Sequence, residues 1–125
     1  MLEKIVQRLK SKKIEKGWGY ELHIVNNDMY CGKILHFNQD GEMSMHYHME
    51  KHETFYVLSG ILYLRGIDHE NAEPYEIEIK PGDVIEIKPG VAHKLIAHTE
   101  AEIFEVSTPD FYEDNFRIQK GDSQK

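Results

Sequence analysis

Apolar and polar residues alternate in short runs between Tyr20 and Thr108. Successive side chains of a β-strand point to opposite faces, so this period of two predicts strands with one buried and one exposed face. Turn residues in stretches such as "NQDG", "KPGD" and "KPGV" separate the runs. The predicted strands are residues 20–25, 30–37, 43–49, 54–59, 61–66, 75–79, 84–87, 93–97 and 102–107. Short strands at near-regular spacing predict an all-β fold, either a barrel or a sandwich.

The two ends of the chain have a different pattern. Leu2, Ile5, Val6 and Leu9 have the spacing of one helix face, so a short N-terminal helix is expected within residues 1–16. Residues 17–108 would form the barrel and residues 109–125 a C-terminal tail. The tail is wholly polar after Ile118, and its last few residues are expected to be disordered.

Length and charge limit the possible functions. A chain of 125 residues is long enough for one domain with a single core. The formal net charge of −7 argues against nucleic acid and against an anionic membrane surface as partners. The single cysteine, Cys31, cannot form an internal disulfide, and the N-terminus has no continuous apolar segment. These features predict a soluble cytoplasmic protein.

The stretch "MSMHYHMEKHE" contains the most distinctive chemistry. His46 and His48 are two residues apart on a predicted strand, so they project from the same face and can chelate a metal. Glu53 and the distant His93 could complete the set. Three imidazoles and a carboxylate suit one divalent transition metal such as Zn, Mn, Fe, Co or Ni. The alternative is that both histidines are exposed strand residues that bind nothing.

Two motifs carry a wider resemblance. Gly41, His46-x-His48, Glu53 and Gly60 resemble the first signature of the cupin superfamily, and "PGDVIEIKPGVAH" at residues 81–93 resembles the second. The resemblance implies a single cupin β-barrel of jelly-roll type, with His46, His48, Glu53 and His93 as metal ligands inside it. It also implies a homodimer formed through outer sheet faces.

A narrower resemblance concerns the reaction. "EKGWGYEL", "HETFYVLSG" and "EVSTPDFYEDNFRI" occur in the order found in the type II mannose-6-phosphate isomerase domain group. Trp18 and Gly19 match the opening of that domain, and the acidic pair Glu113 and Asp114, followed by Arg117, matches its end. The resemblance implies an aldose–ketose isomerase that acts through a metal-stabilised enediolate on a small-molecule substrate, a sugar or sugar phosphate. Carbohydrate metabolism would be its setting.

Several residues are candidates for parts of this reaction. His52, Glu50 and Lys94 lie near the ligands in the sequence and could transfer the proton. Arg117 could bind the phosphate, although a surface ion pair is an equal alternative. Trp18 could stack on the sugar, although a place in the core is the commoner role of such a residue. An iron-dependent cupin dioxygenase and a non-catalytic sugar-binding cupin remain the alternative functions.

Overall fold

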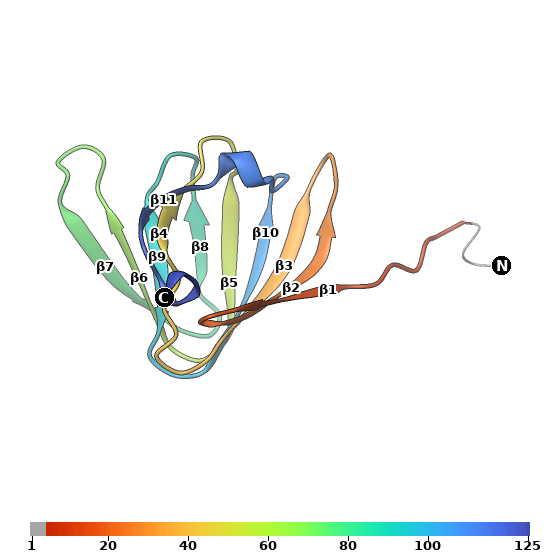
Figure 1. Ribbon diagram of the computed structural model, residues 1–125, viewed down its shortest axis with the longest axis horizontal. Coiled ribbons are helices and arrows are strands. Elements are labelled where there is room, and N and C mark those ends of the chain that lie inside the picture. Colours follow the sequence, from red (N-terminus) through yellow and green to blue (C-terminus); the bar gives the residue numbers. More distant parts are fainter. Residues whose placement is uncertain (1–4) are drawn as a thin grey trace.

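The computed structural model describes residues 5–125, which form two antiparallel β-sheets (Figure 1). The strands are β1 (Lys12–Lys16), β2 (Gly19–Asn26), β3 (Cys31–Phe37), β4 (Met45–Tyr47), β5 (Glu53–Ser59), β6 (Leu62–Ile67), β7 (Pro74–Ile79), β8 (Val84–Ile87), β9 (His93–Ala97), β10 (Ala101–Ser107) and β11 (Phe116–Gln119). Two short 3-10 helices, η2 (Tyr112–Asp114) and η3 (Asp122–Gln124), flank β11. The prediction of an all-β fold is confirmed.

The strand order shows how distant parts of the chain meet. One sheet has the order β1-β2-β3-β10-β5-β8 and the other the order β11-β4-β9-β6-β7. Pairing of β3 with β10, for example Leu35 opposite Ile103, joins residues far apart in the sequence. The two sheets face each other as the walls of a jelly-roll barrel, with the C-terminal segment near the front in Figure 1.

Alternate side chains of the strands fill the space between the sheets. Leu35, Phe37, Val57, Leu95 and Ile103 are almost completely buried and belong to one hydrophobic cluster. Their neighbours along each strand face outward. At one end of the barrel the inward positions are occupied by charged residues such as Lys33 and Glu105. The alternation in the sequence therefore marks the inner face of both sheets correctly.

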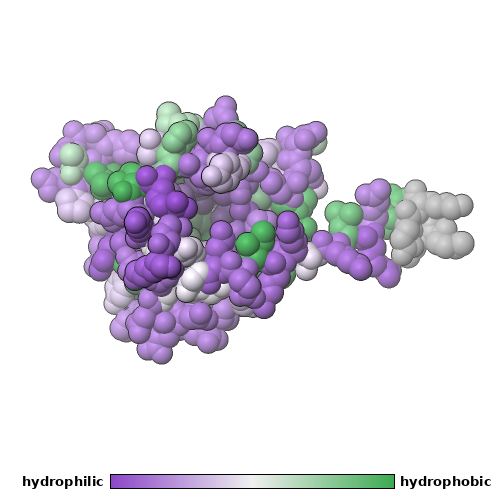
Figure 2. Space-filling model, in the orientation of Figure 1, coloured by the Kyte–Doolittle hydropathy of each residue, from purple (hydrophilic) through white to green (hydrophobic). Residues whose placement is uncertain are grey.

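The expected N-terminal helix is wrong for the part of the chain that the structure describes. Residues 12–16 form β1, and residues 5–11 have no helix but extend away from the barrel (Figure 1). Ile5 and Leu9 are 86% and 68% exposed, and hydrophobic patches are visible on this arm in Figure 2. A short amphipathic helix is stable only when its apolar face is packed, and no surface covers it here. Leu2 lies outside the described residues.

The C-terminal end is held against the barrel, so the expectation of a disordered end is also wrong. The backbone N–H of Asp122 donates to the carbonyl oxygen of Glu42 at 2.8 Å, and the N–H of Glu42 donates to the Asp122 carboxylate at 2.8 Å. Within residues 5–125 no helix has the length and apolar character needed to span a membrane.

Candidate metal centre

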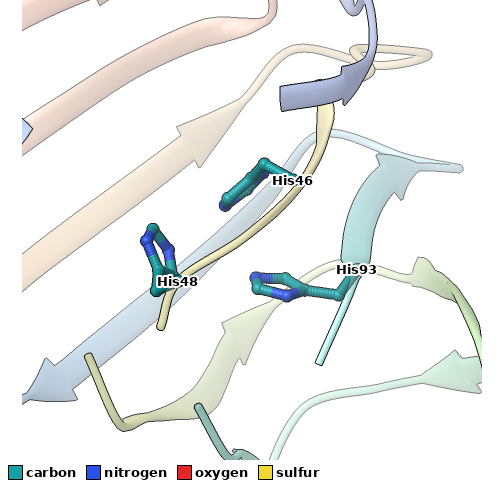
Figure 3. Close-up of side chains that lie close together, drawn as sticks. All are labelled: His46, His48 and His93. Atoms are coloured by element: carbon teal, nitrogen blue, oxygen red, sulfur yellow. The ribbon is translucent and has the colours of Figure 1, made fainter. Parts of the chain in front are cut away.

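The fold places three histidines from β4, from the residue after it and from β9 side by side at one end of the barrel interior. His46 in β4 lies directly opposite His93, the first residue of β9, and His48 follows β4 on the same face as His46. One nitrogen atom from each ring lies within 4.8 Å of the other two. Figure 3 shows the three imidazoles turned toward one another. The predicted same-face pair is thus joined by the histidine from the second motif.

Each imidazole is oriented by a backbone carbonyl group. The Nδ1 atoms donate to the carbonyl oxygens of Ser44, Asp114 and Val91, at 2.9 Å for His46, 3.0 Å for His48 and 2.8 Å for His93. A carbonyl oxygen only accepts, so these bonds place the proton on Nδ1 and leave a lone pair on Nε2. This is the tautomer that a metal-binding histidine needs.

A turn between strands helps to position these histidines. Gly90, with φ of +85°, lies in the left-handed region between β8 and β9. Its backbone N–H donates to the carbonyl oxygen of His48 at 2.5 Å. Glycine adopts this backbone conformation without steric cost. The hydrogen bond therefore links the "KPGV" turn, which leads to His93, to the segment that carries His48.

Glu53 brings a carboxylate to the same point. Its Oε2 atom lies 3.2 Å from His48 Nε2 and 3.8 Å from His93 Nε2. Neither approach has hydrogen-bond geometry, and within residues 5–125 Glu53 Oε2 and His93 Nε2 are buried polar atoms without a hydrogen-bond partner. Burying such atoms unpaired is costly, whereas a cation bound between them would satisfy both. The residues present therefore fit one divalent transition metal.

The protonation of this cluster follows from its burial and its charges. Burial lowers the pKa of His46 to about 3, and burial also lowers the pKa of His93. Burial lowers the pKa of His48 as well, but the Glu53 carboxylate outweighs it and holds that pKa above its ordinary value. For Glu53 burial raises the pKa, and the neighbouring His48 and Lys51 outweigh it, so the carboxylate stays ionised. The cluster thus keeps neutral imidazoles at His46 and His93 beside an anionic oxygen.

Asp114 supports the centre without facing it. Its buried carboxylate accepts the backbone N–H groups of Met49 at 2.8 Å, Glu50 at 3.1 Å and Lys51 at 2.9 Å. Its own carbonyl oxygen orients His48. We expected Asp114 only as a match to a family ending. Sequence spacing gave no sign that residues 49–51 lie next to it.

The centre opens into a cavity of about 520 Å³. The cavity is lined by all four expected ligands and by Arg117. Arg117 in β11 lies directly opposite His46, so both side chains project from the same face. A second cavity of about 360 Å³ adjoins the first and shares His46 and Arg117 with it. Within residues 5–125, Arg117 forms no ion pair with Glu113 or Asp114, and its side chain is exposed.

The structure places the three candidates for proton transfer outside this cavity. His52 bonds to Glu86 at 2.9 Å in a partly exposed pair, and Glu50 is exposed. Lys94 pairs with Glu42 and follows His93 in β9, so it projects from the opposite face of that strand. Closeness in sequence to the ligands did not bring these groups together with them.

Trp18 belongs mainly to the core. It is 4% exposed and stacks on Phe37 with ring centroids 4.4 Å apart. Trp18 and Arg117 are both among the residues that line the second, smaller cavity.

Comparisons with known proteins agree with this architecture. A family model described as "Cupin domain" matches residues 33–107. No curated protein matches the sequence. Similar solved structures include the oxalate decarboxylases of Bacillus subtilis at pH 4.6 (TM-score 0.74, 17% identity) and of Lactobacillus farciminis in a formate complex (TM-score 0.75, 18% identity). Each alignment covers 86% of this chain, which spans 30% and 34% of those chains. A further structure of the Bacillus subtilis enzyme concerns its Mn(II) centres (TM-score 0.72, 17% identity).

Proposed function

This chain belongs to the cupin domain family, and from that premise we propose that it is a metal-dependent sugar-phosphate isomerase. The observation that carries the proposal is the convergence of three imidazole Nε2 atoms and the Glu53 carboxylate on a cavity that Arg117 also lines. A metal-binding end and a cationic group in one cavity suit a substrate that carries both vicinal oxygens and a phosphate.

The proposed roles follow from the positions of the side chains. His46, His48, Glu53 and His93 would hold the metal, which supplies Lewis-acid polarisation of a carbonyl group without any redox change. The guanidinium of Arg117 would bind the phosphate, since its planar fork matches phosphate oxygens. Proton transfer then falls to a group on the cavity wall, because His52, Glu50 and Lys94 do not line it.

The similarity to oxalate decarboxylases concerns the fold alone, because the sequence identity to the two structures is only 17% and 18%. A cavity of about 520 Å³ has more room than so small a dianion as oxalate fills. This volume favours a larger substrate such as an open-chain sugar phosphate.

The second part of the proposal is a homodimer in the cytoplasm. Five apolar side chains stand in register across the outer face of the larger sheet, and we call them the outer apolar row: Leu22, Ile34, Phe104, Tyr56 and Val84. Tyr56 and Val84 are 45% and 64% exposed. A row of uncharged side chains of this kind fits a second copy of itself across a two-fold axis. Light scattering should give twice the 14.7 kDa chain mass, and Tyr56→Lys should give the monomer.

An anaerobic assay tests the reaction. Metal-loaded protein is incubated with a panel of aldose and ketose phosphates, and interconversion is followed by NMR. We expect interconversion by the wild type and its loss in His46→Ala. Oxygen consumption with an iron-loaded protein would instead indicate a dioxygenase. Thermal stabilisation by a sugar phosphate without turnover would indicate a binding protein.

A further inference from the structure

A chain of charged side chains, three of them buried and two half-buried, lines the wall of the cavity opposite the histidines. Five side chains alternate in sign along it: Glu105, Lys51, Asp110, Lys33 and Glu21. Lys51 Nζ lies 2.7 Å from Glu105 Oε2 and 3.8 Å from Asp110 Oδ1. Lys33 pairs with Asp110 and lies 3.7 Å from Glu21 Oε1. We refer to these five residues as the buried ion-pair chain.

The backbone fixes the position of this chain. Glu105 in β10 lies directly opposite Lys33 in β3, so both side chains project from one face of the larger sheet. That face is the inner one, because Lys33 and Glu105 are 5% and 4% exposed. His46 and His93 come from strands of the facing sheet, and His48 directly follows one of them. The cavity therefore has imidazoles on one side and paired charges on the other.

Stability alone is a weak reason for a protein to keep these charges. Moving an ion from water into a protein interior is costly. A protein with well-packed apolar residues in place of buried ion pairs is often as stable or more stable. All five residues line the same cavity as the four metal-ligand candidates. Their remaining donor and acceptor capacity is therefore directed at whatever occupies the cavity.

On the basis of the proposed function, we infer that the buried ion-pair chain is a subsite for the hydroxyl groups of a polyhydroxylated substrate. A hydroxyl group both donates and accepts, so successive hydroxyls match a wall on which ammonium donors alternate with carboxylate acceptors. An apolar substrate would leave these groups unpaired. A phosphate placed on this wall would face three carboxylates and only two ammonium groups, so it would be repelled. The phosphate of the substrate therefore belongs near Arg117 on the facing sheet.

Binding of two unreactive probes to the metal-loaded protein tests this subsite. A hexitol 6-phosphate carries the full row of hydroxyls, whereas glycerol 3-phosphate carries the phosphate with few of them. Glu105→Gln and Lys33→Met should each weaken hexitol phosphate binding by about tenfold or more, and glycerol phosphate binding by less than about twofold. The matched control is Glu102→Gln in the same strand, since Glu102 bonds to His36 at 3.0 Å on the other face.

Different outcomes separate the subsite from the reaction. Equal weakening of both probes, unchanged hexitol phosphate affinity, or no binding by the wild type would overturn the subsite. Loss of metal from both Glu105→Gln and Lys33→Met would also overturn it, because the effect would then act through the metal centre. If the probes behave as expected but no aldose phosphate is isomerised, the subsite stands and the isomerase proposal fails.

Discussion

Replacement of Asp114 by Asn tests whether the C-terminal segment supports the metal centre. The carboxylate accepts three backbone N–H groups from residues 49–51, and the carbonyl oxygen of Asp114 orients His48. Asn keeps one acceptor oxygen but puts an NH₂ group where the second oxygen was. If the carbonyl of Asn faces Met49 and Glu50, the N–H of Lys51 faces another donor.

The expected magnitude follows from these bonds. A hydrogen bond to a charged acceptor contributes about 1.5–3 kcal/mol, so loss of one such bond and weakening of two should destabilise the metal-free protein by about 2–3 kcal/mol. If about 2 kcal/mol of this destabilisation comes from lost order in residues 48–51, the metal affinity should fall about thirtyfold. Asp114→Ala, which leaves all three N–H groups without this acceptor, should have a larger effect on both quantities.

Two measurements separate support of the centre from general stability. Urea unfolding of the metal-free protein gives the free energy of unfolding, and competition with a chromophoric chelator gives the metal affinity of the folded protein. The control is Glu113→Gln, the exposed neighbour in the same 3-10 helix, which should change neither quantity. A destabilised Asp114→Asn protein with metal affinity within about twofold of the wild type would refute this reasoning.

Three further predictions concern the ligands and the phosphate. His93→Ala should reduce the metal content below about a tenth of an equivalent, whereas His98→Ala should retain it; equal losses in an elemental analysis would mean that the site is misplaced. Metal affinity should fall by about tenfold per pH unit below the pKa of His48, because a proton must leave that ring before it binds metal. Burial lowers that pKa but Glu53 raises it above its usual value, so Glu53→Gln should shift the onset to lower pH in a chelator titration. Arg117→Met should raise KM for a sugar phosphate at least about tenfold and leave the metal content unchanged, and an unchanged KM would remove Arg117 from the phosphate site.

Local pattern was sufficient for the strands that have a buried and an exposed face. The predicted run 102–107 corresponds closely to β10, and 93–97 to β9. β1 and β11 were missed because their residues are mostly exposed, so burial leaves no alternating pattern in the sequence. The N-terminal helix was predicted from a correct spacing, but packing rather than spacing stabilises a short helix.

The sequence by itself determined the fold class and, through two motifs, which histidines and which glutamate to consider. These follow from short-range chemistry: period-two alternation, turn residues and the same-face spacing of His46 and His48. Only the tertiary structure decided what surrounds them. Pairing of β4 with β9 and β11, and of β3 with β10, joins residues that no local pattern links. That pairing placed Arg117 beside His46, left Lys94 outside and built the buried ion-pair chain, because side-chain neighbours across a sheet depend on register and not on sequence distance.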